Sequence, residues 1–376
     1  MRVGIIKETL ENERRIAAVP ETVSKMTKAG TEVLIESGAG SGSFISDGEF
    51  EAVGASISSR DEILSSADVL LKVNKPTTAE IEKMKEGAIV ISFLQPFSSP
   101  EEIKKLAGRK VSALSMEMVP RITRAQRMDA LSTMSTVAGY KVVLLAADAS
   151  GRFFPMLSTA AGTIPPCKAI IIGAGVAGLQ AIATAKRLGA VVTAFDVRPA
   201  AGEQVKSLGA EFVSLDVPHE QAEDTGGYAK ELPPEFYQKE QEIIRKYSKD
   251  TDIIISTALI PGKKAPVLIT EDMVKEMKPG SVIVDMAVEF GGNCTLSEAG
   301  KEVVKHGVTI IGYSNIPAMM PVHASLLYAK NILAFVNLIS PDGKSATLDL
   351  EDDIIKGSLI THAGEIVHPA IKEAVK

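Results

Sequence analysis

The sequence predicts an α/β protein of two domains, each built around a mainly parallel, doubly wound sheet. Three observations support this fold class. The 376 residues are too many for one ordinary hydrophobic core. Apolar runs of strand length alternate with helical segments in both halves of the chain. A glycine-rich turn, Gly173-Ala-Gly175-Val176-Ala-Gly178, directly follows one of these runs.

The second half of the chain predicts a six-stranded parallel sheet. The run before the glycine-rich turn is expected to be its central strand, as in the Rossmann order of strands. The predicted strands cover residues 169–172, 191–195, 211–214, 253–255, 282–284 and 309–311.

The first half alternates in the same way and predicts a second Rossmann-like domain. Long apolar helical patterns near residues 126–147 and 324–338 are expected to link the two domains, and a hairpin is expected around His362-Ala-Gly364. The predicted domains are therefore 1–128 with 322–376, and 129–321, with a deep cleft between them that could present a ligand. The strands of the first half are predicted at residues 3–6, 33–36, 69–73, 89–93 and 111–114.

The glycine-rich turn matches a dinucleotide-binding loop. Gly173 permits the tight turn, Gly175 leaves no Cβ in the way of a pyrophosphate, and Gly178 allows the helix to pack closely on its strand. The phosphates would then lie at the helix N-terminus. A glycine pattern alone is a weak signal, but here the preceding strand and the following helix agree with it.

Asp196 indicates which dinucleotide is bound. It ends the second predicted strand, 18 residues after Gly178, where a carboxylate accepts hydrogen bonds from an adenosine ribose and repels a 2′-phosphate. NAD(H) is therefore expected rather than NADP(H). Arg198 could instead accommodate a 2′-phosphate, but we interpret it as an exposed arginine.

Composition excludes several other functions. A net charge of -6 without a concentrated basic face argues against nucleic-acid binding. The start of the chain lacks a secretory pattern, and the apolar window 169–185 is interrupted by the glycine turn, so we expect a cytoplasmic chain with no membrane-spanning segment. Two cysteines, Cys167 and Cys294, and five histidines without ligand spacing predict no metal site.

Residues 216–235 fit neither a helix nor a strand. They carry acids, three prolines and Gly226-Gly227 next to Tyr228. Loops of this length are usually functional lids or disordered segments. Its place after the third strand favours a lid over the cofactor, although a merely solvated loop is the alternative.

Several motifs together resemble one family. The sequence resembles the NAD(H)-binding first component of proton-translocating nicotinamide nucleotide transhydrogenase, essentially from end to end. The run from Arg121 to Asp129 is the most specific match. The other matching motifs are Glu13-Arg14-Arg15-Ile16, Asp196-Val197-Arg198, Gly226-Gly227-Tyr228, Thr257-Ala-Leu259-Ile-Pro-Gly262 and Lys278-Pro-Gly-Ser-Val-Ile-Val-Asp285.

Alanine dehydrogenase is a sister family with the same architecture. The resemblance implies that those enzymes use a lysine and a histidine where this chain has Asn74 and Gln95, and an aspartate where it has Glu289, while Arg15 is retained. Oxidising an amine requires a group that removes a proton, and neither amide titrates. Direct hydride transfer between two nicotinamides requires no such base, only positioning.

The resemblance implies specific site residues. Gln126 would hydrogen-bond the nicotinamide carboxamide, Arg121 and Asp129 would form the pair that orients it, and Ser132 would line the same site. Each also has an ordinary structural interpretation, such as an exposed arginine or an aspartate at a helix N-terminus. The other cofactor-contacting positions that it implies are Val176, Asp196, Val197, Arg198, Gly227, Tyr228 and Leu259, beside the three glycines of the loop.

The resemblance also implies partners. An NADP(H)-binding subunit would receive or supply the hydride, and a membrane subunit would conduct protons, with this chain a homodimer at the cytoplasmic face of the membrane. Two alternatives stay open: a free-standing amino-acid dehydrogenase that uses Arg15 and Glu289, and a non-catalytic module that senses NAD.

Overall fold

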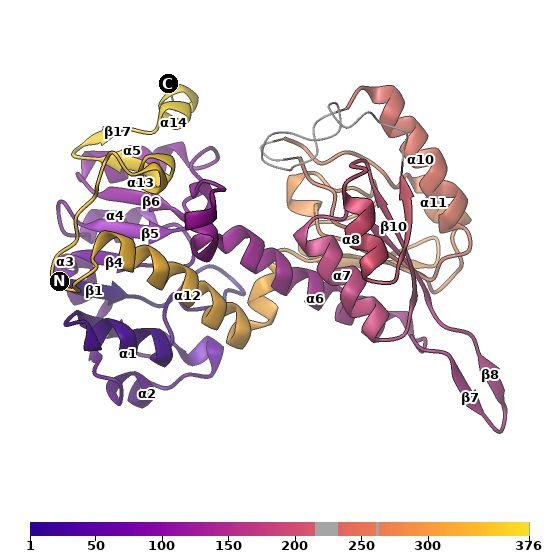
Figure 1. Cartoon of the computed structure of the whole chain (residues 1–376), viewed down its shortest axis with the longest axis horizontal. Helices are drawn as coiled ribbons and strands as arrows, with labels where there is room; N and C mark the ends of the chain where they lie inside the picture. Colours follow the sequence, from indigo (N-terminus) through magenta and orange to yellow (C-terminus); the bar gives the residue numbers. More distant parts are fainter. Residues whose placement is uncertain (215–231, 261–262, 376) are drawn as a thin grey trace. The chain divides into compact units, whose positions relative to one another are not determined.

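The computed structural model describes residues 1–214, 232–260 and 263–375. The chain divides into two compact units, which Figure 1 colours along the sequence. The first unit joins the two ends of the chain, Met1–Met134 and Pro317–Lys376, and the second is Ser135–Ile316. Because the units are separate packing entities, each is described by itself.

The sheet of the second unit has the strand order β11-β10-β9-β12-β13-β15-β14. All six predicted strands are present and parallel, which confirms the Rossmann-like sheet. A seventh strand, β14, runs antiparallel to β15 and was not predicted, because its exposed Lys-Glu-Val-Val-Lys sequence lacks an apolar run. The strands are β9 (Lys168–Ile172), β10 (Val191–Asp196), β11 (Glu211–Ser214), β12 (Ile253–Ser256), β13 (Val282–Asp285), β14 (Lys301–Lys305) and β15 (Val308–Gly312).

Both faces of this sheet are covered by helices. Ala169 and Ile171 of β9 pack with α6, α7 and α8 on one face, whereas Ile170 and Ile172 pack with α10 and α11 on the other. This two-sided burial is why the strands read as continuous apolar runs. The helices are α6 (Ala130–Ser150), which begins in the first unit, α7 (Val176–Arg187), α8 (Ala201–Ser207), α10 (Pro234–Ser248), α11 (Glu271–Glu276) and the 3₁₀ turn η4 (Val288–Phe290).

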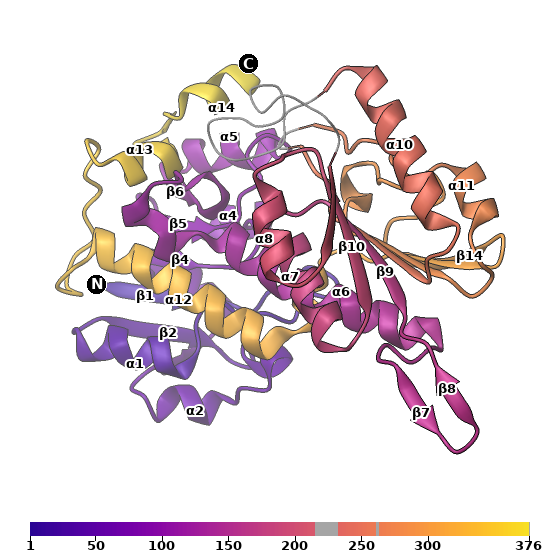
Figure 2. The same cartoon turned by 45° about the vertical axis from the view of Figure 1, so that its right-hand side comes forward.

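A two-stranded hairpin, β7 (Leu157–Thr159) and β8 (Gly162–Ile164), projects from the rest of the second unit (Figures 1 and 2). This hairpin was not predicted, because both strands are short and largely polar. Its backbone is paired only within the hairpin. The hairpin therefore adds no strand to the sheet that forms the core.

The first unit contains an eight-stranded sheet of order β17-β16-β6-β5-β4-β1-β2-β3. The hairpin predicted around His362 is confirmed: β16 and β17 are antiparallel, and β16 also pairs with β6. The edge strand β3 was not predicted. The strands are β1 (Arg2–Ile5), β2 (Glu32–Glu36), β3 (Ser56–Ser58), β4 (Val69–Leu71), β5 (Ile89–Ser92), β6 (Ser112–Ser115), β16 (Leu359–His362) and β17 (Glu365–Ile366).

Short, capped helices cover one face of the first sheet. The side chains of Ser59 and Thr77 each accept a hydrogen bond from a first-turn backbone N–H, so they cap α3 and α4. Apolar residues of α3, α4, α5 and α14 share one core cluster with the sheet. The helices are α1 (Pro20–Lys28), α2 (Asp47–Glu51), α3 (Arg60–Ser66), α4 (Thr78–Lys83), α5 (Pro100–Gly108), α12 (Pro321–Ile339), α13 (Asp353–Ser358) and α14 (Pro369–Ala374), with 3₁₀ turns η1 (Ser41–Ser43), η2 (Met116–Met118), η3 (Thr123–Met128) and η5 (Ile316–Met319).

Two helices are long and apolar enough to cross a membrane by length and composition, α6 and α12. The expectation that the chain has no membrane-spanning segment stays a prediction, because this criterion does not test it. Within their apolar windows, 44% of the residues of α6 and 56% of those of α12 are buried inside the protein. Composition alone does not distinguish an apolar helix that packs in a protein core from one that faces lipid.

Candidate functional site

The glycine loop connects β9 to α7, as expected. Gly173 has a φ of +89°, a conformation that side-chain-bearing residues rarely adopt. A Cβ on Gly178 would lie 1.8 Å from the carbonyl oxygen of Gly173, so the helix can approach the strand only because this residue is glycine. The loop geometry thus depends on both residues.

The N-terminus of α7 is open to a ligand. Gly175 is the N-cap residue and supplies no side-chain hydrogen bond to the first turn of the helix. A Cβ built on Gly175 would meet no heavy atom within 4 Å. The uncapped N–H groups and the positive end of the helix dipole fit a pyrophosphate, which a dinucleotide would bring to this position.

Asp196 ends β10 and is 7% exposed. Its Oδ2 accepts a hydrogen bond of 2.7 Å from the backbone N–H of Ala174, which ties the end of the strand to the glycine loop. Its Oδ1 accepts one of 2.8 Å from the backbone N–H of Arg198. The carboxylate is therefore held at the carboxyl end of the sheet, where an adenosine ribose would lie.

Arg198 is not an exposed arginine, so that expectation was wrong. Its side chain is 15% exposed and forms a bidentate contact with Asp196, from Nε to Oδ1 at 2.9 Å and from Nη2 to Oδ2 at 2.8 Å. The two residues are two positions apart just after the strand, so the pair forms locally. A ribose that binds Asp196 would have to share the carboxylate with this guanidinium or displace it.

Two residues that were not predicted fix this end of the sheet: Thr257 contacts the glycine loop, and Asn293 contacts the end of β12 and the segment that follows it. Thr257, directly after β12, donates from Oγ1 to the carbonyl oxygens of Ile172 and Gly173, each at 3.1 Å. Asn293 donates to the carbonyl of Ala258 at 3.0 Å and accepts from Ser256 at 2.6 Å. Only the pairing of neighbouring strands brings these residues together, so no local motif could reveal them.

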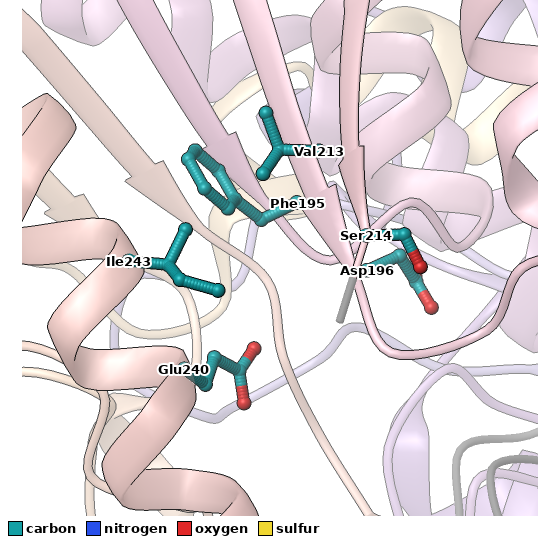
Figure 3. Close-up of a pocket in the computed structure, with 6 residues that line it drawn as sticks. All are labelled: Phe195, Asp196, Val213, Ser214, Glu240 and Ile243. Atoms are coloured by element: carbon teal, nitrogen blue, oxygen red, sulfur yellow. The ribbon is translucent and has the colours of Figure 1, made fainter. Parts of the chain in front are cut away.

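A small, solvent-open hollow lies at the end of β10 (Figure 3). Asp196 lines one side, and Glu240 of α10 lines another. Burial, with the nearby Asp196 charge as the second cause, raises the pKa of Glu240 to about 8. Glu240 was not predicted, because it is one acid among several on a charged helix. The remaining lining residues are Phe195, Val213, Ser214 and Ile243.

The other predicted cofactor positions of the second unit differ in exposure. Val176 and Leu259 are 40% and 38% exposed, so their side chains are available to a ligand. Val197 is buried and packs with Leu232, so it contributes to the local core. Gly227 and Tyr228, together with the predicted lid up to residue 231, lie outside the described residues.

The four predicted positioning residues lie in the first unit. Arg121 and Gln126 are exposed, the latter within η3. Asp129 precedes α6 and accepts hydrogen bonds from the N–H and the hydroxyl of Ser132, at 2.8 and 2.6 Å. Asp129 thus caps the helix, and Ser132 contacts it as expected for neighbours. The pairing of Arg121 with Asp129 stays a prediction.

Four positions are those that the resemblance relates to the chemistry of alanine dehydrogenase. Arg15 is buried and its guanidinium contacts Glu13, with 2.6 Å between Nη2 and Oε2. Asn74 donates from Nδ2 to Glu13 at 3.0 Å. Gln95 is exposed, with a φ of +50°, and Glu289 is exposed in η4. Neither amide can accept a proton from a substrate amine.

Among the described residues, no cluster of histidine, cysteine, aspartate and glutamate could hold a metal ion. A Rossmann-type sheet, an open glycine loop on a helix N-terminus and an anchored acid after the second strand together define a dinucleotide-binding α/β protein. Sequence profiles of the family described as alanine dehydrogenase/PNT match residues 4–138 with its N-terminal domain and 142–369 with its C-terminal domain. The chain belongs to the alanine dehydrogenase/PNT family.

This chain differs between its transhydrogenase and alanine dehydrogenase relatives more in sequence identity than in similarity of fold. An NAD(P) transhydrogenase subunit alpha chain of Rhodospirillum rubrum is 50% identical over 379 residues, which cover 99% of each chain. The structure of transhydrogenase from Sinorhizobium meliloti has a TM-score of 0.87 at 43% identity, covering 98% of this chain and 100% of that one. An L-alanine dehydrogenase structure has a TM-score of 0.84 at 26% identity, covering 100% and 99%.

Proposed function

We propose that this chain is the NAD(H)-binding subunit of a proton-translocating nicotinamide nucleotide transhydrogenase. The observation that carries the proposal is the pair of amides, Asn74 and Gln95, at the two positions where the resemblance implies a titrating lysine and histidine in the sister dehydrogenases. Similarity to a transhydrogenase subunit over almost the whole chain supports the same assignment.

The second unit would hold NAD(H). The backbone of the loop at Gly173, Gly175 and Gly178 would bind the pyrophosphate, and Asp196 would accept hydrogen bonds from the adenosine ribose. Val176, Val197, Arg198 and Leu259 would flank the cofactor, as would Gly227 and Tyr228. These assignments rest on the open, uncapped start of α7 and on the fixed position of the Asp196 carboxylate.

The nicotinamide of NAD(H) exchanges a hydride directly with that of NADP(H) on a partner subunit. The residues of this chain would act as positioners rather than as acids, bases or nucleophiles. Gln126 would hold the carboxamide with its complementary donor and acceptor, Arg121 would orient it, and Asp129 and Ser132 would fix the local backbone, because they already cap α6.

The proposed complex requires two partner subunits. One binds NADP(H), and the other conducts protons through the membrane and couples their flow to hydride transfer through conformational change. This chain would act at the cytoplasmic face of the membrane. The Rhodospirillum rubrum relative is itself named as a subunit, which supports a function that depends on other chains.

We also propose that the chain forms a homodimer through the β7–β8 hairpin. An isolated two-stranded hairpin is at best marginally stable in water, and this one exposes Ile164 at 41%. Phe153 and Met156, just before it, are 56% and 63% exposed. We expect the double variant Met156→Ser/Ile164→Ser to sediment as a monomer. Val304→Ser, on the exposed edge strand β14, is the matched control and should leave the mass unchanged.

The decisive experiment mixes this chain with an NADP(H)-binding transhydrogenase subunit and follows NADPH-dependent reduction of an NAD analogue. We expect the rate to rise with the concentration of this chain. A non-catalytic NAD sensor would leave it unchanged. In a parallel assay, NAD-dependent oxidation of L-alanine at an ordinary enzymatic rate would contradict the proposal and favour the amino-acid dehydrogenase.

A further inference from the structure

Asn293 is a fully buried amide in the segment that follows β13. Its Nδ2 donates to the carbonyl oxygens of Ala258 at 3.0 Å and Pro266 at 2.8 Å, and its Oδ1 accepts from the hydroxyl of Ser256 at 2.6 Å. Both N–H groups and the oxygen of the amide are therefore used. Because the two carbonyls both need donors, only one orientation of the amide fits this site.

The hydrogen bonds of Asn293 join the two ends of the connection that follows β12. Ala258 lies at the start of this connection and Pro266 near its end, and a single NH₂ group donates to both. The neighbouring Ala265 N–H donates to the carbonyl of Phe290 at 2.8 Å, so the connections after β12 and β13 are also joined through their backbones. Losing the amide would leave two carbonyls unsatisfied, which costs free energy.

The position of Asn293 is itself fixed from both sides. Asp285, fully buried at the end of β13, accepts a hydrogen bond of 3.0 Å from the N–H of Cys294. The carbonyl of Asn293 accepts from the N–H groups of Leu268 and Ile269, each at 2.9 Å. The side-chain amide is therefore held rigidly, and its hydrogen bonds transfer this fixed position to the connection after β12.

The connection after β12 begins at the edge of the sheet where a dinucleotide would bind. β12 pairs with one side of β9, the strand before the glycine loop, and β10 pairs with the other side. The strand order thus reverses between β9 and β12, and doubly wound sheets bind ligands in the crevice at such a point. Leu259 follows Ala258 here and is 38% exposed. Holding the Ala258 carbonyl therefore also fixes the direction of the Leu259 side chain.

We propose that Asn293 is a positioning residue for NAD(H), which holds the backbone at Ala258 so that the Leu259 side chain packs against the bound cofactor. The inference deepens the proposed function and rests on the assignment of Leu259 to the cofactor site. Asn293 itself does not touch the ligand, because its amide is buried and fully used within the protein. Its contribution to affinity is that the loop is already ordered before NADH arrives.

The first test is a double-mutant cycle on the NADH affinity of the full chain. Leu259→Ala and Asn293→Leu should each weaken NADH binding about three- to tenfold, the first by losing apolar contact and the second by displacing it. The double variant should bind NADH like Asn293→Leu alone, because a displaced Leu259 has no contact left to lose. Losses that multiply would show that the two residues act independently, which overturns the inference.

Asn293→Asp repeats the cycle without a change of size, in case the leucine variant does not fold. Aspartate keeps the acceptor for Ser256 but has at most one donor for the two carbonyls, so a similar coupling with Leu259→Ala is expected. Leu259 is exposed, so its alanine variant does not depend on core packing. An NADH affinity of Leu259→Ala equal to that of the wild type overturns the inference by itself.

Ser297→Ala is the matched control for a general loss of stability. It removes the 2.7 Å hydrogen bond to Asp285 at the same end of the sheet and leaves the amide of Asn293 in place. Its melting temperature should fall, while NADH affinity should stay within about twofold of the wild type. If Ser297→Ala weakens NADH binding as much as Asn293→Leu does, the effect is one of stability, and the positioning role is wrong.

The outcomes separate this inference from the proposed function. If the wild type binds NADH and Asp196→Ala weakens this binding, the proposed NAD(H) site stands. An unchanged affinity of Leu259→Ala, or an absence of coupling with Asn293, then overturns only the positioning role. If the wild-type chain does not bind NADH, the proposed function itself fails.

Discussion

The two units build similar sheets but end their first strands in opposite ways. In the second unit, β9 runs directly into a glycine loop whose helix begins uncapped, so backbone donors face open space. In the first unit, β1 is followed by a long connection that reaches α1 only at Pro20. The acids of this connection form ion pairs within the protein: Glu13 pairs with Arg15, and Glu8 pairs with the buried Lys72.

This difference indicates that the loops at the strand ends, rather than the sheet itself, determine which ligand a doubly wound unit binds. In the second unit the donors at the strand ends are left for a ligand. In the first unit, the comparable space is filled with ion pairs that stabilise the fold only if they stay complete. Four predictions test this contrast, beginning with the largest expected effect.

Arg15→Met should destabilise the protein by about 3–5 kcal/mol, because it leaves a buried carboxylate without its cation. The Glu13 side chain that it abandons is 0% exposed. Urea unfolding measures the change, and 5′-AMP affinity should be unaltered, since the adenosine site lies in the second unit. Arg14→Met, at the exposed neighbouring position, should cost less than about 1 kcal/mol. Equal effects of the two variants would argue against the buried pair.

Gly178→Ala and Gly175→Ala should separate stability from binding in the glycine loop. Alanine at 178 meets the carbonyl of Gly173 and should destabilise the protein by about 1–3 kcal/mol, with loss of NADH binding. Alanine at 175 meets nothing in the folded chain, so its melting temperature should match the wild type while NADH affinity falls about tenfold. Normal NADH affinity of Gly175→Ala would show that the pyrophosphate binds elsewhere.

Gln126→Ala should slow hydride transfer about tenfold and change NADH affinity by less than about threefold, because most of the affinity comes from the pyrophosphate and adenosine contacts. Stopped-flow transfer with the NADP(H)-binding partner and NADH titration measure the two quantities. Thr123→Ala, exposed in the same 3₁₀ turn, is the control. Equal losses in rate and affinity would contradict a positioning role.

Glu240→Gln should flatten the pH dependence of stability. The pKa of Glu240 rises from 4.5 to about 8 on folding, so the folded state holds a proton that the unfolded state releases between these values. The stabilisation from this group is therefore complete below pH 4.5. It decreases by at most about 1.4 kcal/mol per pH unit as pH rises toward 8, and then levels off. Melting curves of the two proteins at pH 5.5 and 8 should show a smaller difference for the variant.

Much of the fold was predictable because parallel strands buried on both faces form continuous apolar runs. Ile170, Ile171 and Ile172 reveal β9 by composition alone, and the glycine turn after it has a single good structural solution. The edge strand β14 and the hairpin β7–β8 escaped prediction, because exposed strands carry no apolar signal.

The residues of the candidate site likewise fall into those that the sequence reveals and those that it does not. Gly173, Gly178 and Asp196 are visible in the sequence because their tasks are local to one strand, turn and helix. Thr257, Asn293 and Glu240 are not, because each acts on a segment distant along the chain: Thr257 contacts the loop after β9, and Glu240 lines the hollow beside Asp196. Arg198 was misjudged because its exposure depends on the bidentate contact with that same acid.

By itself, the sequence determined the class of fold, the dinucleotide loop and the absence of a titrating side chain at Asn74 and Gln95, since each follows from residue type and short-range spacing. Tertiary structure alone decided which acids are neutralised and which are left facing a ligand. Glu13 and Glu240 are both buried glutamates, yet the first contacts Arg15 and the second faces an open hollow. Burial and partners are set by the packing of distant segments, and these properties determine the charge and hydrogen bonding of a side chain.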